Sequence, residues 1–167
     1  MKIIAFTGYK KSGKDAAAKQ LSQILLPATI KHVNFADALK QEVAVACGTT
    51  LDYINTNKDV FRTILQWWGT DFRRNLVSEH YWTVRWLRIL NEMSSLPDYL
   101  LCTDVRFANE AFVVRSLGGI IIRVQRPDIQ SDGHASETEQ RELHAEFTVN
   151  NDGTLDDLKE KLKNIKL

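Results

Sequence analysis

The segment GYKKSGKD, residues 8–15, has the residue types and the spacing of a loop that binds phosphate. It matches G-x-x-x-x-G-K, follows the apolar run IIAFT and leads into the helix-forming stretch AAAKQLSQIL. Glycines at both ends let the backbone fold tightly, so that consecutive N–H groups and the positive helix N-terminus face an anion, while Lys14 reaches the terminal phosphates. The alternative, an ordinary glycine turn, is disfavoured by the spacing and the flanks. The candidate nucleotide ligands on this pattern are Gly8, Lys10, Lys11, Ser12, Gly13, Lys14 and Asp15.

The residue after the loop lysine departs from the usual pattern. A Ser or Thr hydroxyl at this position ordinarily ligates Mg²⁺, and this chain has Asp15 instead. A carboxylate could hold magnesium directly or through water, because magnesium prefers oxygen ligands and keeps several waters. Alternatively, Asp15 only favours the helix N-terminus electrostatically. The residues themselves leave both interpretations open, and Asp15 is the candidate metal ligand.

The segment VFRTILQWWGTDFRR, residues 60–74, carries two stripes at about 100° per residue. The first stripe is apolar and predicts burial: Phe61, Leu65, Trp68 and Phe72. The second stripe lies about a quarter turn away and combines two cations, an amide and a glycine, which leaves space: Arg62, Gln66, Gly69 and Arg73. Polar donors beside a buried face indicate the rim of a pocket. A solvated helix face is an equal alternative on this pattern alone.

The next predicted helix, residues 79–93, contains Tyr81, Trp82 and Trp86. Aromatic residues at helical spacing are mostly core residues, and Trp86 fits that description. Trp82 lies near the helix start and close to the polar flank, so it could equally stack on a nucleobase. From the residues alone the core is favoured.

The strand-like run YLLCT ends at Asp104, and Arg106 and Glu110 follow before a helix. A carboxylate at this edge could position an acceptor hydroxyl or the water shell of magnesium, and Arg106 could clamp a phosphate in a bidentate way. The plainer interpretation is a helix N-terminal charge effect for the two acids and a surface ion pair for Arg106. We favour a functional role, because ligands of such sheets gather at this edge.

A polar stretch after the run IIIRVQ predicts a lid loop over about residues 126–138. Enzymes that transfer phosphate must exclude water, so a closing loop that brings Arg126 to the site would serve the chemistry. His134 could equally be an ordinary surface histidine. Ser136 and Glu137 are candidates for capping the following helix.

The elements that position these residues alternate along the chain. Short apolar runs predict strands at residues 2–7, 32–35, 99–103, 120–125 and 147–149. Longer periodic patterns predict helices at residues 14–26, 37–46, 58–75, 79–93, 109–117 and 155–165. The alternation predicts a three-layer α/β fold with a five-stranded, mostly parallel sheet and helices on both faces. We expect one domain over residues 1–167, with a substrate-binding helical portion over about 36–95.

Composition narrows the class of protein. The 167 residues carry 22 Lys and Arg against 21 Asp and Glu, so there is no overall basic field for a stable nucleic-acid partner or an anionic membrane. The apolar run before Gly8 is too short for a signal peptide or a membrane span. We therefore expect a globular protein of the cytoplasm.

The chain resembles the bacteriophage deoxynucleoside monophosphate kinases in segments that follow the family's order and cover nearly its whole length: GYKKSGKDAAA, FADALK, LQWWGTDFRR, HYW, TDVRFANEA, GGIIIRVQRP, HASE and VNNDGTLDDL. The GKD ending of the phosphate loop is itself a family trait. The resemblance implies a P-loop nucleoside monophosphate kinase fold and transfer of the γ-phosphate of ATP, with Mg²⁺, to a deoxynucleoside monophosphate. The resemblance implies that Lys10, Ser12, Gly13, Lys14, Asp15 and Ala16 contact ATP. The implied monophosphate ligands are Ala36, Asp37, Arg62, Gln66, Gly69, Thr70, Trp82, Asp104, Arg106 and Glu110, and we add Lys40 and Arg73 to the expected set.

The expected mechanism is direct in-line transfer without a covalent enzyme intermediate. The residues expected to act on the transferred group or the acceptor are Lys14, Arg62, Asp104, Arg106 and Arg126. The alternatives are a P-loop kinase for another acceptor, such as a phosphorylated metabolite or a modified base in DNA, and a regulatory module that uses ATP as a switch. The segment 47–58 is shorter than in some family members, which leaves the accepted base and dimerisation open.

Overall fold

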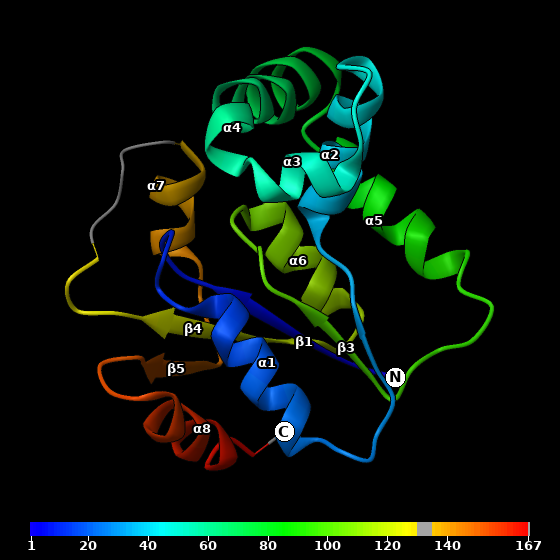
Figure 1. Ribbon diagram of the computed structural model, residues 1–167. Helices are drawn as coiled ribbons and strands as arrows, with labels where there is room; N and C mark the ends of the chain where they lie inside the picture. Colours follow the sequence, from blue (N-terminus) through cyan, green and yellow to red (C-terminus); the bar gives the residue numbers. More distant parts are fainter. Residues whose placement is uncertain (130–134, 167) are drawn as a thin grey trace. The chain divides into compact units, whose positions relative to one another are not determined.

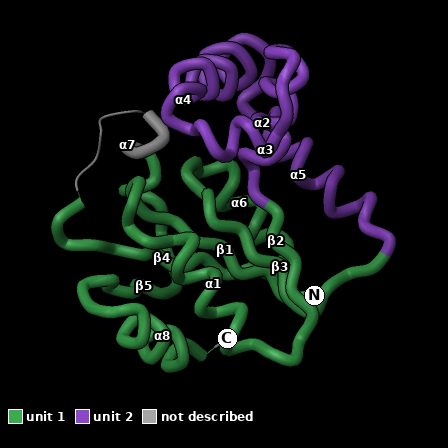
Figure 2. Tube along the Cα trace, in the orientation of Figure 1, with its two compact units in different colours: residues 1–33, 95–167 green, residues 34–94 purple. Residues whose placement is uncertain are grey.

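The computed structural model describes residues 1–129 and 135–166. The chain forms two compact units, which Figure 2 colours separately. Unit 1 comprises Met1–Val33 and Ser95–Leu167, and unit 2 comprises Asn34–Ser94. Unit 2 spans nearly the residues of the expected helical portion. Within the described ranges, no helix is long and apolar enough to cross a membrane.

Unit 1 is built on a parallel sheet whose described strands follow the order β2-β3-β1-β4-β5. All four neighbouring pairs are parallel, so the predicted fold class is confirmed. The order places β1 in the centre, and the loop after β1 therefore leaves from the middle of the carboxyl edge. The strands are β1 (Lys2–Thr7), β2 (Ile30–His32), β3 (Tyr99–Cys102), β4 (Ile120–Gln125) and β5 (Phe147–Asn150).

Helices cover both faces of this sheet (Figure 1). α1 (Lys14–Ile24) and α8 (Leu155–Lys163) pack on one face, where they share a buried cluster with β1, β4 and β5. α6 (Ala108–Ser116) and α7 (Ala135–Glu142) belong to the other face. Arg123 alternates with Ile122 and Val124 along β4, and its guanidinium donates to the Gln140 carbonyl of α7 at 3.0 Å.

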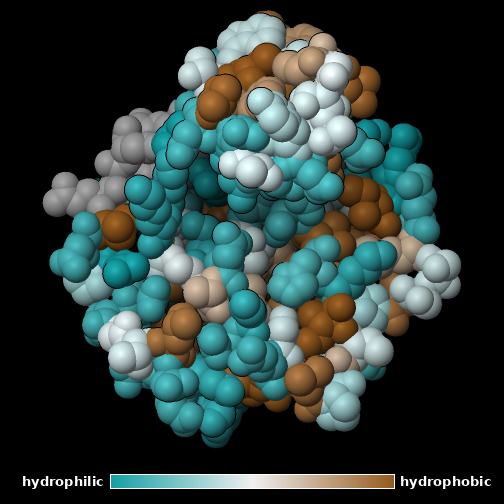
Figure 3. All heavy atoms as spheres, viewed as in Figure 1, coloured by the Kyte–Doolittle hydropathy of each residue, from teal (hydrophilic) through white to brown (hydrophobic). Residues whose placement is uncertain are grey.

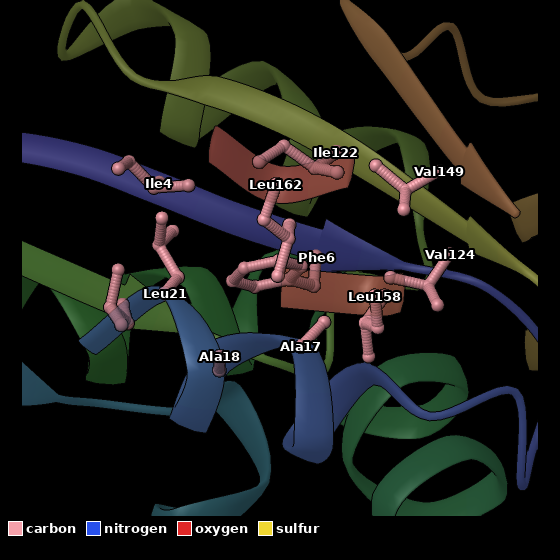
Figure 4. Close-up of a cluster of buried hydrophobic side chains, with 11 residues drawn as sticks. Ile4, Phe6, Ala17, Ala18, Leu21, Ile122, Val124, Val149, Leu158 and Leu162 are labelled. Atoms are coloured by element: carbon pink, nitrogen blue, oxygen red, sulfur yellow. The ribbon is translucent and has the colours of Figure 1, made fainter. Parts of the chain in front are cut away.

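The core beneath α1 explains how the phosphate loop is anchored (Figure 4). Phe6 of β1 is fully buried and packs in one cluster with Ala17 and Ala18 of α1. These small side chains let α1 lie close to the sheet directly after the loop. From α8, Leu158 and Leu162 complete the cluster, while the outer surface of that helix is hydrophilic (Figure 3). Both ends of the loop are thus held by a close-packed core.

Unit 2 is helical throughout its described elements: α2 (Phe35–Ala46), α3 (Leu51–Thr56), α4 (Lys58–Gln66), η1 (Trp67–Val77) and α5 (Tyr81–Asn91). Val43, Ala44 and Ile54 form its small buried cluster, and Phe61 and Leu65 pack against it as the apolar stripe predicted. η1 is a π-helix, a wider helix with i→i+5 hydrogen bonds such as that from Ser78 N to Arg73 O.

The structure differs from the expected elements in four places. Phe35 is not in a strand, because Asn34 caps α2 and Phe35 begins that helix. The helix expected over 58–75 changes to a π-helix after Gln66. α3 was not predicted in segment 47–58. The loop expected over 126–138 ends early, because α7 begins at Ala135 and so Ser136 and Glu137 lie within the helix.

Candidate active site

The loop between β1 and α1 turns through three residues with positive φ: Gly8 (140°), Lys11 (65°) and Gly13 (100°). At Gly8 a side chain is excluded, because an added Cβ would lie 2.2 Å from the Val124 carbonyl oxygen. Gly13 is the N-cap of α1 and has no side chain that could cap the helix. The loop therefore has the backbone form that phosphate binding requires.

Lys14 folds back on the loop from which it extends. Its Nζ donates to the carbonyl oxygens of Gly8 at 2.7 Å and Tyr9 at 2.8 Å. The ammonium is thereby held at the loop rather than in solvent. This is the position from which a lysine can reach a phosphate cradled by the same backbone.

Asn151 directly follows β5 and links the phosphate loop to the edge of the sheet by hydrogen bonds. Its Nδ2 donates to the Ser12 carbonyl at 2.9 Å, and its backbone N–H donates to the Gln125 carbonyl at 2.7 Å. In the loop and at the end of β1, respectively, the hydroxyl oxygens of Ser12 and Thr7 are buried and have no hydrogen-bond partner among the described residues. Buried hydroxyls without a partner are uncommon and mark a place where a polar ligand or water fits.

Asp15 stands in the first turn of α1 and is exposed. Its Oδ1 accepts a hydrogen bond from the Thr103 hydroxyl, which follows β3, at 2.7 Å. Among the described residues no group of three or more His, Cys, Asp or Glu could form a metal site alone.

Asp104 and Arg106 lie beyond the carboxyl end of β3 and are half-buried. The Cys102 thiol donates to Asp104 Oδ1 at 3.2 Å. Full burial raises the pKa of this thiol well above its ordinary value, with Asp104 adding to the shift, so the thiol stays neutral and remains a donor. The pair holds Asp104 in place at the sheet edge.

Glu110 has a structural role at the start of α6. The carboxylate is 3% exposed, and Oε2 accepts from the backbone N–H groups of Arg106 at 2.8 Å and Phe107 at 3.2 Å. It caps the start of α6, as the helix-terminus interpretation expected. A role for Glu110 in substrate binding stays a prediction.

Arg126 leaves the end of β4 and is exposed. Its carbonyl accepts from Ile129 N at 3.1 Å, a turn that redirects the chain after the strand. His134 lies outside the described residues. The structure therefore leaves the expected role of the lid untested.

In unit 2, the FADALK turn opens α2. Asp37 Oδ2 accepts from Asn34 N at 2.9 Å in a capping box, and Asp37 Oδ1 lies 3.8 Å from Lys40 Nζ. Ala36 occupies the same first turn. These contacts give Asp37 and Lys40 local structural partners, and their expected contacts with a monophosphate stay predictions.

Arg62 and Gln66 lie four residues apart on α4 and are both half-buried, as the polar stripe predicted. Gly69 follows in η1 and is buried. An added Cβ there would lie 2.9 Å from a Leu39 methyl carbon, so a side chain would collide with α2. Thr70 beside it is half-buried. Of the expected polar flank, Arg62 and Gln66 are thus partly exposed to solvent, while Gly69 allows η1 to approach α2.

Trp82 is 3% exposed, and its indole N–H donates to the Gly69 carbonyl at 2.9 Å. The core interpretation thus holds for this residue, and little of the ring is available for stacking on a base. Its hydrogen bond fixes the backbone of η1 beside Thr70. Trp82 can influence a ligand by positioning that turn.

The polar stripe placed Arg73 on the rim of a pocket, but its guanidinium is paired with Glu42 inside unit 2. Its Nε and NH2 both contact Glu42 Oε2 at 2.8 Å, and its guanidinium lies over the rings of Phe72 and Tyr81. Glu42 also accepts from Trp68 Nε1 at 3.1 Å and from the Tyr81 hydroxyl at 2.5 Å. In the wider π-helix the residue rotates away from the direction that an α-helix predicts, so Arg73 joins a structural network.

The Glu42 network sets a dependence of stability on pH. Burial raises the pKa of Glu42, but hydrogen bonds from Tyr81, Trp68 and Arg73 outweigh it and lower the pKa below its ordinary value of 4.5. Burial, with Glu42 as neighbour, raises the pKa of Tyr81, which therefore remains a donor. The depressed pKa of Glu42 stabilises the fold at pH values above 4.5, and this contribution is lost as the pH falls through the folded-state value.

We therefore expect Glu42→Gln to lower the free energy of unfolding by about 2 kcal/mol at neutral pH, because charged hydrogen bonds are lost. The difference in the free energy of unfolding between the variant and the natural chain should shrink as the pH falls and Glu42 of the folded natural chain becomes protonated. Urea unfolding at neutral and acidic pH measures both effects. Glu92→Gln, at an exposed position just after α5, is the control. A deficit that stays constant with pH would contradict this account of Glu42.

Comparison with known proteins adds the family to this geometry. The family model described as "Deoxynucleotide monophosphate kinase" matches residues 28–162, which is most of the chain. The chain belongs to the deoxynucleotide monophosphate kinase family. The match covers the sheet edge after β3 and all of unit 2, while the phosphate loop lies before its first residue.

Three curated relatives of this family are similar to the chain. A putative deoxynucleotide monophosphate kinase of Acanthamoeba polyphaga mimivirus is 32% identical, over 86% of this chain and 84% of that protein. The deoxynucleotide monophosphate kinases of Enterobacteria phage T4 and Escherichia phage RB69 are 33% and 31% identical over 78% and 67% of this chain. The matches span only 56% and 48% of those two phage proteins, about half of their length.

A solved structure supports the fold alone. TT1252 from Thermus thermophilus superposes with a TM-score of 0.51 at 18% identity, over 97% of this chain and 94% of that one. A likeness at this identity speaks for shared architecture and not for shared chemistry. Function is therefore argued from the site residues of this kinase family member.

Two residues of the site were missed from the sequence. Thr103 ends an apolar run and had the appearance of an ordinary strand residue, yet its hydroxyl contacts Asp15. Asn151 lies in a polar turn and contacts Ser12. Both contacts join residues far apart in the chain, so no local spacing could have indicated them. Within unit 1, the structure thus brings the end of β3 and the turn after β5 to the phosphate loop.

Proposed function

We propose that the chain is a deoxynucleoside monophosphate kinase that transfers the γ-phosphate of ATP to a deoxynucleoside monophosphate, giving the diphosphate and ADP. The observation that carries the proposal is the phosphate loop at the centre of a parallel sheet, with Lys14 held against the loop carbonyls. Membership of the family supports this choice of acceptor. A phosphate loop alone would support only nucleotide binding.

In this proposal the phosphates of ATP lie on the backbone of the loop and the N-terminus of α1. Lys14 neutralises charge that spreads over the transferred group, which is where catalysis of phosphoryl transfer mostly arises. The buried Ser12 and Thr7 hydroxyls are available as donors within or beside the loop. The other proposed ligands of ATP are Gly8, Lys10, Lys11, Gly13, Asp15 and Ala16.

Magnesium fits the oxygen donors that are present. Asp15 supplies an exposed carboxylate, of which Oδ1 already accepts from Thr103. When bound, magnesium would supply positive charge to the phosphate oxygens. The part of the protein is to hold a carboxylate where that ion can use it.

For the acceptor, unit 1 offers Asp104 and Arg106 at the carboxyl edge of its sheet. We propose that Asp104 orients the acceptor side, and that Arg106 binds phosphate together with Arg126 from the end of β4. Transfer is direct and in line, and it needs no covalent enzyme intermediate.

Unit 2 offers the half-buried side chains of Arg62, Gln66 and Thr70. We propose that these contact the monophosphate, with the guanidinium of Arg62 on its phosphate. We do not extend the proposal to Arg73, whose guanidinium is paired with Glu42. Trp82 is proposed to position the η1 turn rather than to stack on a base.

The partners in this proposal are small molecules. The near balance of charge gives no reason for a stable nucleic-acid partner, and a DNA acceptor would call for a basic groove. Dimerisation is not part of the proposal. We propose the cytoplasm as the compartment, that of the host if the chain is phage-encoded, because ATP and free monophosphates are found there.

A screen of all common deoxynucleoside monophosphates, including hydroxymethylated ones, tests the proposal. The purified chain is incubated with ATP and Mg²⁺, and ADP release is followed by a coupled assay. We expect release that depends on at least one added monophosphate. Release that is the same without any monophosphate, or that requires DNA, would favour the regulatory module or the kinase for another acceptor.

Arg62→Ala should raise KM for the monophosphate by at least about tenfold while KM for ATP changes little, since one charged hydrogen-bond partner is lost from the acceptor alone. Steady-state kinetics with each substrate varied in turn measures the split. Arg88→Ala, at an exposed position on α5, is the matched control and should leave both constants unchanged. Equal weakening of both substrates in Arg62→Ala would argue against this assignment.

A further inference from the structure

The contact between Asp15 and Thr103 joins the helix after the phosphate loop to the end of a neighbouring strand. Thr103 Oγ1 donates to Asp15 Oδ1 at 2.7 Å, across a sequence separation of 88 residues. Thr103 is 7% exposed, whereas Asp15 is exposed. The structure gives Asp15 Oδ2 no hydrogen-bond partner among the described residues. One carboxylate oxygen is thus anchored by the protein, and the other is available to a ligand.

In P-loop proteins the helix after the loop and the neighbouring strand ordinarily supply these two groups the other way round. The residue after the loop lysine supplies a Ser or Thr hydroxyl, and a carboxylate comes from a strand beside the loop. Here the carboxylate comes from the helix, at Asp15, and the hydroxyl comes from the strand end, at Thr103. A hydroxyl and a carboxylate are both still present, but their places in the chain are exchanged.

Asp104, the neighbour of Thr103, does not make this contact with Asp15. The Thr103 hydroxyl reaches the start of α1, while Asp104 Oδ1 accepts from the Cys102 thiol. The side chain after β3 that contacts Asp15 is therefore a hydroxyl.

We propose that Asp15 and Thr103 form an exchanged magnesium pair, in which Asp15 offers Oδ2 to the magnesium of the bound nucleotide and Thr103 is its positioning residue. The inference rests on the proposed use of Mg²⁺ and ATP. Without the Thr103 hydroxyl, the Asp15 carboxylate would lose its anchor and rotate freely in solvent. A partner that orients a metal-binding carboxylate typically contributes 10-fold to 100-fold in metal affinity, or roughly one to two powers of ten.

The test measures metal binding directly. Mn²⁺ is titrated into the full chain saturated with a non-hydrolysable ATP analogue, and binding is followed by electron paramagnetic resonance. Thr103→Val should weaken Mn²⁺ binding by about tenfold or more, whereas Thr103→Ser, which keeps the hydroxyl, should bind nearly as the natural chain does. Binding of the analogue in EDTA should be unchanged in both variants. If Thr103→Val does not fold, Thr103→Ala carries the same expectation.

An exchange variant makes the proposal sharper. Asp15→Thr alone should lose Mn²⁺ affinity, and Asp15→Thr combined with Thr103→Asp should recover most of it, because the pair then has the ordinary P-loop order. The proposal is overturned if Thr103→Val binds Mn²⁺ as the natural chain does, or if the combined variant is no better than Asp15→Thr. Failure of the proposed function is recognised separately, as a natural chain that phosphorylates no monophosphate.

Discussion

Lys14→Ala is expected to lower kcat for phosphorylation of a deoxynucleoside monophosphate by about 10³-fold. The ammonium is held at the loop by the carbonyls of Gly8 and Tyr9, so it is already placed for the phosphates that the loop would bind. Its loss removes charge stabilisation that acts mostly in the transition state, and kcat should therefore fall far more than KM for ATP rises. Steady-state kinetics at saturating substrates measures the fall.

Lys19→Ala is the matched control, because Lys19 is an exposed lysine on the same helix α1. Its kcat should stay within about twofold of the natural value, as is usual for solvated surface charges. A Lys14→Ala enzyme that keeps most of its activity would mean that transfer does not take place on this loop. Loss of activity in both variants would point instead to a general effect of charge on α1.

Gly8→Ala is expected to lower the free energy of unfolding by about 3 kcal/mol, because a side chain there combines a strained backbone with overpacking. The residue has φ of 140°, and its added Cβ would lie 2.2 Å from the Val124 carbonyl oxygen. This oxygen belongs to the backbone of β4 and cannot move without disturbing the sheet. Nucleotide affinity should fall with stability, since the same displacement opens the loop.

Gly118→Ala separates the two causes of this loss. Gly118 also has positive φ, at 75°, but no atom lies within 4 Å of an added Cβ. Only the conformational cost remains there, about 1 kcal/mol. Urea unfolding of both variants gives the comparison. Equal losses would show that strain alone acts at Gly8 and that the close approach to β4 is unimportant.

The parts of the fold that local patterns specify could be predicted from the sequence. The run IIAF of β1 is continuously apolar and buried because helices cover both faces of the sheet. The phosphate loop was recognisable because its glycines and Lys14 are needed at fixed spacing. Arg62 and Gln66 were placed correctly on one flank, since α4 is a regular helix as far as Gln66.

The predictions that failed concern geometry that a local sequence pattern does not specify. The change to a π-helix at Trp67 alters the angle between residues, so Arg73 turns toward Glu42 instead of continuing the polar stripe. Nothing in the spacing distinguishes i→i+4 from i→i+5 hydrogen bonds. Phe35 was assigned to a strand because its apolar neighbours extend that run, and the Asn34 capping box decided otherwise.

The contacts of the site that were missed are long-range. Thr103 is a good strand residue by type, and its contact with Asp15 follows only from the parallel pairing of β1 and β3, which brings the two residues together. Asn151 reaches Ser12 because β5 ends beside β4 at the same edge of the sheet. Such pairings are set by the packing of the whole unit, and they explain how an unusual Asp15 can be accommodated.

The most direct test of the proposed function follows the phosphate itself. The natural chain is incubated with Mg²⁺, ATP radiolabelled at its γ-phosphate, and an unlabelled deoxynucleoside monophosphate, and the products are separated by chromatography. The proposal predicts that label moves into the β-phosphate of the deoxynucleoside diphosphate and that none moves when the monophosphate is omitted. Label found only as inorganic phosphate, at a rate independent of every added monophosphate, would contradict it.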